Sequence, residues 1–241
     1  MIVYGRNILV EALKSSSCVS DIFLEESLSS NNSQKILDII SLAKKRNLPY
    51  KFISRKKIKS LTHSDEHQGV CAKVQLFWST KLNEVVKDFN KNYIYIYELA
   101  FEHNLGAIIR SAECAGFGGV IVPNDVSITP TVAKSSAGSI FHIPVCKESI
   151  FQAIRYFKKN GFKIIGIERD GKKYYNEELS FPSLFIIGGE DKSLSENVRN
   201  NCDSVVEIPQ FGKVNSLNMS VAASVIMFES LRQKQKAMSN N

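Results

Sequence analysis

Short apolar runs alternate with stretches of helical periodicity through the second half of the chain. The apolar runs are typical of buried strands and lie at 93–99, 119–122, 141–145, 162–167, 184–187 and 204–208. The intervening stretches predict helices over 104–115, 130–137, 150–159, 193–200 and 217–232. Because strand and helix follow each other repeatedly, we expect an α/β fold with a mostly parallel, Rossmann-like sheet and helices on both faces. Ligands of such folds bind in loops beyond the carboxyl ends of the strands.

The first part of the chain predicts a smaller α/β unit. Strands are expected near 19–24, 49–54 and 69–76, with helical patterns around 8–13 and 36–43. The composition changes near 77–81, where the last of these strands stops and a mixed polar stretch begins. We therefore predict a small domain over 1–76, a linker over 77–90 and a second domain over 91–241.

Composition places the chain among ordinary globular proteins. Of its 241 residues, 44% are hydrophobic and 23% charged, which excludes disordered, collagen-like and coiled-coil classes. No apolar run approaches the roughly 18 residues of a membrane span. Met1–Asn7 lacks the pattern of a signal peptide, so we expect a cytoplasmic protein. The five cysteines are scattered and form no Cys-x-x-Cys pair, which favours reduced thiols and no metal site.

The charge balance points to a polyanionic partner. Lys and Arg number 31 against 24 Asp and Glu, a net charge of +7. Between 44 and 59 the chain has eight basic residues and no acidic one, with Tyr50 and Phe52 interleaved. This stretch is either an RNA-facing patch or a solvated face of a helix–strand–helix unit. Under the first interpretation, Lys56, Lys57 and Lys59 are candidate RNA contacts.

Three loops at predicted strand ends carry the candidate chemistry. The first runs from Asn104 to Arg110; Asn104 could be only a helix cap and Arg110 only a surface residue. In the second, Gly188 and Gly189 follow a buried strand, where their backbone can approach a ligand closely, and Glu190 opens a helix.

The third loop, 208–220, has more small and polar side chains than one helix cap needs: Gly212, Asn215, Ser216, Asn218 and Ser220. Together the three loops predict a polar ligand site and leave the ligand open.

Two common nucleotide-binding motifs and one hydrolase motif are missing. The segment 116–121 begins like a dinucleotide fingerprint, but Ile121 stands where the third glycine belongs, and the segment leads from a helix into a strand. A Walker loop and a Gly-x-Ser-x-Gly motif do not occur. These absences count against a nicotinamide-dependent oxidoreductase and an α/β-hydrolase.

The three loops resemble the motifs of the SpoU family, also called TrmH, of RNA ribose methyltransferases. Asn104-x-Gly-Ala-Ile-Ile-Arg110 resembles its motif 1, and Gly188-x-Glu190 its motif 2. Ile208-Pro-x-x-Gly212-x-Val-x-Ser216-Leu-Asn218-x-Ser-Val-Ala222 is similar to motif 3. The first domain, with Tyr4-Gly5 and His67-Gln-Gly-Val70, resembles the family's ribosomal-protein-like RNA-binding domain. This arrangement is most like the bacterial members that methylate a guanosine of 23S ribosomal RNA.

The resemblance implies a trefoil knot in the catalytic domain, whereas the pattern alone predicts an unknotted sheet. It also implies a homodimer and transfer of a methyl group from S-adenosylmethionine to a ribose 2′-hydroxyl. The implied catalytic positions are Asn104, Arg110, Glu190, Ser216 and Asn218, with Arg110 also engaging RNA. The implied cofactor-binding loops contain Gly188, Gly189, Ile208, Gly212 and Leu217.

The chain departs from the family pattern at three positions. Phe101-Glu-His stands before Asn104 where Asp-Pro is usual, Ser193 replaces a glycine, and Gln210 replaces a methionine. These departures bear on substrate identity more than on activity. Alternative functions are methylation of transfer RNA ribose and a non-catalytic, RNA-binding assembly dimer.

Overall fold

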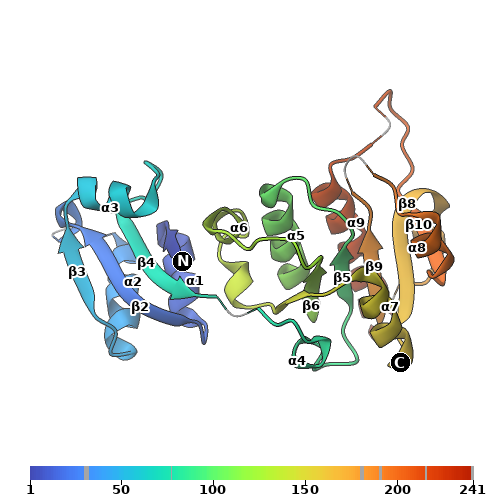
Figure 1. The fold of residues 1–241 in the computed structure, drawn as a ribbon, viewed down its shortest axis with the longest axis horizontal. Helices are drawn as coiled ribbons and strands as arrows, with labels where there is room; N and C mark the ends of the chain where they lie inside the picture. Colours follow the sequence, from blue (N-terminus) through green and yellow to red (C-terminus); the bar gives the residue numbers. More distant parts are fainter. Residues whose placement is uncertain (30–32, 77, 180–181, 190–191, 215, 240–241) are drawn as a thin grey trace. The chain divides into compact units, whose positions relative to one another are not determined.

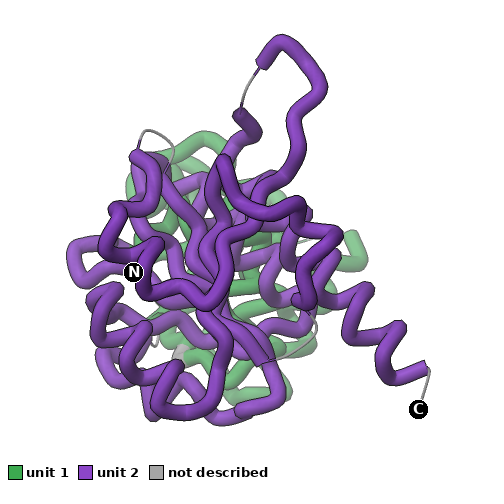
Figure 2. The backbone as a smooth tube through the Cα atoms, turned by 90° about the vertical axis from the view of Figure 1, so that its right-hand side faces the viewer, with its two compact units in different colours: residues 1–77, 128–142 green, residues 78–127, 143–241 purple. Residues whose placement is uncertain are grey.

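The computed structural model describes residues 1–29, 33–76, 78–179, 182–189, 192–214 and 216–239. Contacts divide the chain into two units, which Figure 2 colours separately. Unit 1 comprises 1–77 and 128–142, and unit 2 comprises 78–127 and 143–241. None of the described helices has the length and apolar character of a membrane span.

Unit 2 is built on a six-stranded sheet in which every neighbouring pair is parallel. Its order is β10-β8-β9-β5-β6-β7, and Figure 1 shows β8, β9 and β5 side by side. The strands are β5 (Tyr93–Ile96), β6 (Gly119–Val122), β7 (Val145–Lys147), β8 (Lys163–Lys173), β9 (Ser183–Ile187) and β10 (Ser204–Glu207). The predicted α/β class with a mostly parallel sheet is confirmed.

Helices cover both faces of this sheet because successive strand residues point to opposite sides. On one face, Tyr93 packs against Phe157 of α7, with ring centroids 5.2 Å apart. On the other, Phe185 meets Phe117, which follows α5, at 5.7 Å. The helices of unit 2 are α4 (Leu82–Val85), α5 (Glu102–Cys114), α7 (Ile150–Lys159), α8 (Glu196–Asn200) and α9 (Met219–Ser239), with a 3₁₀ turn at Tyr174–Asn176.

Unit 1 has a mixed four-stranded sheet in the order β1-β4-β2-β3. Only the β2–β3 pair is parallel among the described strands of this sheet. The strands are β1 (Ile2–Tyr4), β2 (Cys18–Glu25), β3 (Tyr50–Ile53) and β4 (Val70–Gln75). The helices are α1 (Arg6–Lys14), α2 (Gln34–Lys45), α3 (Arg55–Thr62) and α6 (Pro130–Ser135), with 3₁₀ turns at Glu26–Leu28 and Ser139–Phe141.

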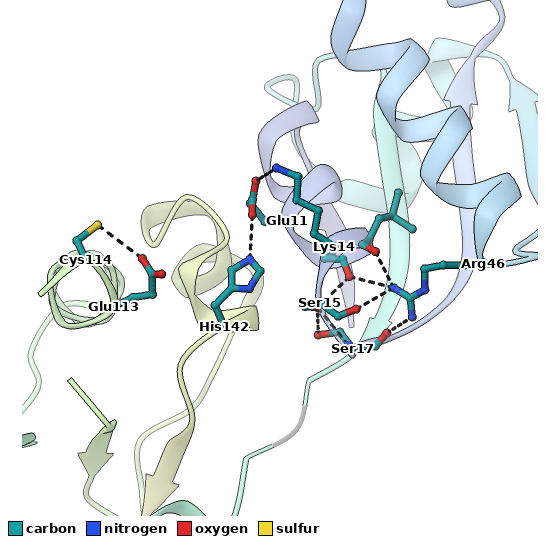
Figure 3. Close-up of polar contacts among 10 residues, drawn as sticks. Glu11, Lys14, Ser15, Ser17, Arg46, Glu113, Cys114 and His142 are labelled. Atoms are coloured by element: carbon teal, nitrogen blue, oxygen red, sulfur yellow. Dashed lines mark hydrogen bonds and ion pairs between the residues drawn. The ribbon is translucent and has the colours of Figure 1, made fainter. Parts of the chain in front are cut away.

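The segment 128–142 belongs to unit 1 through polar contacts as well as packing. The imidazole Nε2 of His142 lies 2.9 Å from Glu11 Oε2 (Figure 3), and Lys134 pairs with Glu66. Partial burial alone raises the pKa of Glu11, but hydrogen bonds with Lys14 and His142 outweigh it, so the pKa is lowered.

One local prediction fails, and two short elements were not predicted. The strand predicted over 141–145 is instead a 3₁₀ turn followed by β7, because Pro144 has no amide hydrogen for the ladder. The sequence reading missed β1 and α4, each shorter than five residues. Helix α4 lies within the predicted linker, yet Leu82 and Val85 are buried in the core of unit 2. The trefoil knot stays a prediction.

Candidate active site

A cavity of about 350 Å³ opens at the edge of the unit 2 sheet where β8, β9 and β10 lie side by side. Because the three strands are parallel, the segments that follow β9 and β10 meet there beside residues 167–169 of β8. The start of α9 forms the remaining wall. The lining residues are Ile167, Glu168, Arg169, Ile187, Gly188, Gly189, Lys192, Ser193, Ile208, Gln210, Ser216, Leu217, Asn218, Met219 and Ala222. We refer to this space as the donor cavity, because the resemblance described above predicts that the methyl donor binds here.

The glycine pair after β9 is needed for close packing between strand ends. A Cβ added to Gly188 would lie 3.0 Å from Glu168 Oε2, and one added to Gly189 would lie 2.6 Å from Glu98 Oε2. The Gly189 amide donates to the Lys192 carbonyl at 2.9 Å. The glycines therefore allow the carboxylates of Glu168 and Glu98 to lie close to this backbone.

A direct hydrogen bond joins the first and third loops. Asn218 Nδ2 donates to Asn104 Oδ1 at 3.1 Å, while Asn218 Oδ1 accepts from the amide of Ser220 at 2.9 Å. Asn104 is buried and is the third residue of α5, whose N-cap is Phe101. The helix-cap interpretation of Asn104 is therefore wrong, since its side chain serves a tertiary contact.

The structure brings some predicted site residues together and leaves others apart. Six line the donor cavity: Gly188, Gly189, Ile208, Ser216, Leu217 and Asn218. Arg110 is exposed on α5 and lies outside the lining formed by the described residues. Gly212 lies between β10 and α9 in sequence, and a Cβ added there meets no atom within 4 Å. Glu190 lies outside the described residues.

The sequence reading missed Glu168, Arg169 and Lys192 in the cavity wall. Glu168 Oε2 accepts from the Leu194 amide at 2.8 Å, so its carboxylate is held in place. Lys192 Nζ lies 3.0 Å from Glu98 Oε1. A carboxylate directly after the buried run Ile164–Ile167 was the available signal for Glu168.

Cysteine and metal chemistry receive no support from the described part of the chain. Burial raises the pKa of Cys71 and Cys202 to about 11 and that of Cys146 to about 12, so these thiols stay protonated near neutral pH. No group of three or more His, Cys, Asp or Glu side chains that could hold a metal ion occurs among the described residues.

The basic stretch of unit 1 divides into side chains with different surroundings. Lys56 and Lys57 are exposed on the first turn of α3. Lys59 is exposed too, but its Nζ lies 2.8 Å from Asp65 Oδ2. Tyr50 and Phe52 contact each other edge to face, with centroids 6.1 Å apart, and Phe52 is partly exposed.

Arg46 has a structural role within this stretch. Figure 3 shows its guanidinium turned toward the end of α1, where it donates to the carbonyl oxygens of Ala12, Leu13, Ser15 and Ser17 at 2.8–3.3 Å. The last carbonyls of a helix lack partners within it, and a cation is favoured there. Arg46 therefore closes the α1 terminus and does not belong with the candidate RNA contacts.

Both parts of the chain match known protein families. Residues 91–228 match the SpoU rRNA Methylase family, and residues 2–77 match the family described as RNA 2′-O ribose methyltransferase substrate binding. The chain belongs to the SpoU methylase family. A candidate TrmH family tRNA/rRNA methyltransferase of Bacillus subtilis, YacO, is similar to this SpoU chain at 31% identity, over 96% of this chain and 95% of YacO. The family's activity is that of an RNA methyltransferase.

Solved SpoU structures share the fold. AviRb from Streptomyces viridochromogenes, in complex with the cofactor AdoMet, has a TM-score of 0.81 at 22% identity, over 98% of this chain and 90% of AviRb. An AdoMet-bound rRNA methyltransferase from Sinorhizobium meliloti gives 0.81 at 21% identity, over 96% and 86%. A TrmH/SpoU tRNA modifying enzyme from A. aeolicus gives 0.55 at 23% identity, over 65% of this chain and 82% of that one.

Proposed function

We propose that the protein transfers a methyl group from S-adenosylmethionine to a ribose 2′-hydroxyl of RNA, at a guanosine of 23S ribosomal RNA. The observation that carries this proposal is the donor cavity, with the Asn104–Asn218 hydrogen bond linking it to α5. Its volume falls in the range of about 300–1,000 Å³ usual for small-ligand sites. Residues of motifs 2 and 3 line this cavity and Asn104 of motif 1 is hydrogen-bonded to it, which supports the proposal.

The cavity residues fit the proposed cofactor. Apolar side chains such as Ile167 and Ile187 offer a surface for the adenine, and the Glu168 carboxylate is positioned to accept hydrogen bonds. We assign cofactor binding to backbone groups of the loops around Gly188, Ile208 and Leu217. Bound S-adenosylmethionine supplies an activated methyl group on sulfonium sulfur.

The protein's own contribution is to place the nucleophile. A ribose hydroxyl is a weak acid, and alignment with the methyl carbon gives the larger gain, while a positioned base adds about 10²–10⁴-fold. A planar guanidinium donates two parallel hydrogen bonds to a phosphate, so we assign Arg110 to holding an RNA phosphate by a bidentate contact. Glu190, Ser216 and Asn218 complete the proposed polar site.

Ribosomal RNA is the preferred substrate because of the first domain. The rRNA methyltransferase from Sinorhizobium meliloti matches 96% of this chain, whereas the tRNA modifying enzyme from A. aeolicus matches only 65%. We keep the proposed division into an RNA-binding domain over 1–76, a linker over 77–90 and a catalytic domain over 91–241. Lys56, Lys57 and Lys59 are its proposed RNA contacts. Transfer RNA is the alternative substrate.

We also propose a homodimer in the cytoplasm. Val221 and Phe228 of α9 are 47% and 46% exposed, and a second copy would cover these apolar side chains.

The test uses S-adenosylmethionine labelled on its methyl group. The purified protein is incubated separately with unmodified 23S ribosomal RNA and with unmodified transfer RNA, and labelled riboses are mapped. Label on one guanosine ribose of 23S RNA is the expected result. Label in transfer RNA alone overturns the substrate assignment and keeps the chemistry. Absence of label in both, with donor binding measured, overturns the enzymatic proposal in favour of an RNA-binding assembly dimer.

A further inference from the structure

A larger cavity of about 540 Å³ lies beside the donor cavity, among the loops that follow β5, β6 and β7. Strand β5 is the neighbour of β9 in the sheet, and Lys192 lines both cavities. Apart from Lys192, and Glu98 through its contact with Gly189, the residues that line this second cavity have no part in the site described above. Its polar and aromatic lining includes Tyr95, Tyr97, Glu98, Asn124 and Asp125.

Glu98 supplies an acceptor that lacks a donor. Its Oε1 pairs with Lys192 Nζ at 3.0 Å, which fixes the carboxylate. Its Oε2 is buried and has no hydrogen-bond partner among the described residues. A buried acceptor without a donor costs free energy, so this position favours a ligand that carries an N–H group.

The other polar groups of this cavity also favour a donating ligand. Asp125 adds an exposed carboxylate, which is an acceptor when ionised. The Tyr95 hydroxyl already donates to the Glu148 carbonyl at 3.0 Å, so its proton is engaged. Tyr97 contributes a half-buried aromatic ring, a side chain suited to contact with a nucleobase.

We propose that this cavity holds the guanine base of the nucleotide whose ribose is methylated. Guanine is the RNA base whose pairing edge presents two adjacent donors, N1–H and the 2-amino group, and two carboxylates supply matching acceptors. The assignment rests on the proposed function, in which the ribose of this nucleotide is methylated. The base must leave its stack so that the ribose can lie between the two cavities. Glu98 and Asp125 then determine specificity for guanosine.

A direct binding experiment tests the cavity without methyl transfer. Equilibrium binding of GMP, IMP and AMP to the full-length protein is measured by ligand-observed NMR. Wild type is expected to bind GMP at least about fivefold more tightly than IMP, which lacks the 2-amino group, and AMP most weakly.

Asp125→Asn and Glu98→Gln should remove the preference for GMP over IMP. Asp88→Asn is the matched control, because Asp88 is exposed and lies outside the described lining of both cavities. Its side-chain Oδ1 accepts a local hydrogen bond from the Asn90 amide, which an asparagine oxygen can also accept. Equal binding of the three nucleotides by wild type overturns the assignment. So does an unchanged preference in both variants.

A transfer experiment separates this assignment from the proposed function. Wild type should methylate RNA with inosine at the labelled position at least about fivefold more slowly than RNA with guanosine there. Asp125→Asn should methylate the two RNAs at equal rates. Label on guanosine with the same preference in wild type and both variants refutes the cavity and keeps the function. Preferential GMP binding without label in any RNA refutes the function and keeps the cavity.

Discussion

The donor cavity and the basic stretch of unit 1 are built in opposite ways. At the cavity, Asn104 and Asn218 are 114 positions apart in sequence and share a hydrogen bond. Within the basic stretch, Arg46 is bound to helix carbonyls, Lys59 faces Asp65, and Lys56 is exposed on α3. Residues close in the chain thus have unlike roles, and residues far apart share one. Parallel strand order explains why distant residues meet at the cavity. Within the basic stretch, each side chain takes whatever surroundings its own position provides.

This contrast shows how each kind of sequence signal errs. A count of consecutive charges includes side chains whose hydrogen bonds stabilise the fold, such as that of Arg46. Motif spacing omits residues that topology adds to a site, such as Glu168 and Lys192. Substitutions in the two regions should therefore change different measured quantities.

Arg110→Ala should have the largest effect, a fall of about 10²-fold or more in methyl transfer, because the variant no longer aligns the RNA. Donor affinity and the proposed dimer should stay unchanged, since Arg110 lies outside the donor cavity. Initial rates with labelled donor, donor titration and size-exclusion chromatography check these outcomes. Arg155→Ala, an exposed arginine on α7, is the control. Full activity of Arg110→Ala would refute its assigned role.

Gly189→Ala should weaken donor binding by about tenfold, because the new Cβ meets Glu98 and, at 3.2 Å, the Lys192 carbonyl. Gly212→Ala is the matched control, since a Cβ there lies in open space. Isothermal titration with S-adenosylmethionine measures both affinities. If Gly212→Ala weakens binding as strongly as Gly189→Ala, the cofactor loop extends to Gly212 and the close-packing explanation fails.

Replacing Lys56 and Lys57 by Gln should weaken RNA binding several-fold and reduce the slope of log affinity against log salt by about 1.4–1.8. Adding Lys59→Gln should change the slope less than either of the other two, since Lys59 already has Asp65 as a partner. Filter binding across a salt series measures the slope. Gln at Lys158 and Lys159 of α7 is the control for total charge. A slope equal to wild type would make the stretch a solvated face.

Many helices, strands and site loops of this protein can be predicted from its sequence. The physical reasons for that success also explain which elements could not be predicted. Long periodic segments such as Ile150–Lys159 were predicted accurately because burial imposes a helical period on them. Short elements such as β1 leave too few residues for a period to show. The motifs located the loops of Gly188 and Leu217, but no pattern reports that β9 and β5 are neighbours. The cavity beside β5 was therefore missed.

Arg46→Gln should lower the free energy of unfolding by about 2 kcal/mol and leave the RNA salt slope unchanged, because carbonyls at the end of α1 lose a charged donor. Urea denaturation measures the first quantity. Lys45→Gln, an exposed neighbour on α2, should change stability little. A changed salt slope in Arg46→Gln would show that Arg46 contacts RNA and would contradict its purely structural role.

The smallest expected effect concerns His67. Burial lowers the pKa of His67 below its ordinary value of 6.5, and its Nδ1 accepts from the Gly69 amide at 2.9 Å. Below pH 6.5 the unfolded chain therefore binds a proton that the folded chain does not, so stability falls as pH falls through this window. Urea denaturation of His67→Asn should show a flatter pH dependence than wild type. His63→Asn, at an exposed position, should keep the wild-type dependence.

The position of the donor cavity in the sequence determines when during synthesis the cavity can form. Its described lining lies wholly between Ile167 and Ala222, whereas unit 1 is complete once His142 has been added. Translation at about 5–20 residues per second separates these points by roughly 4–16 s. A nascent chain thus completes the unit that we propose binds RNA before it completes the donor cavity, and donor binding indicates that nearly the entire chain has been made and folded.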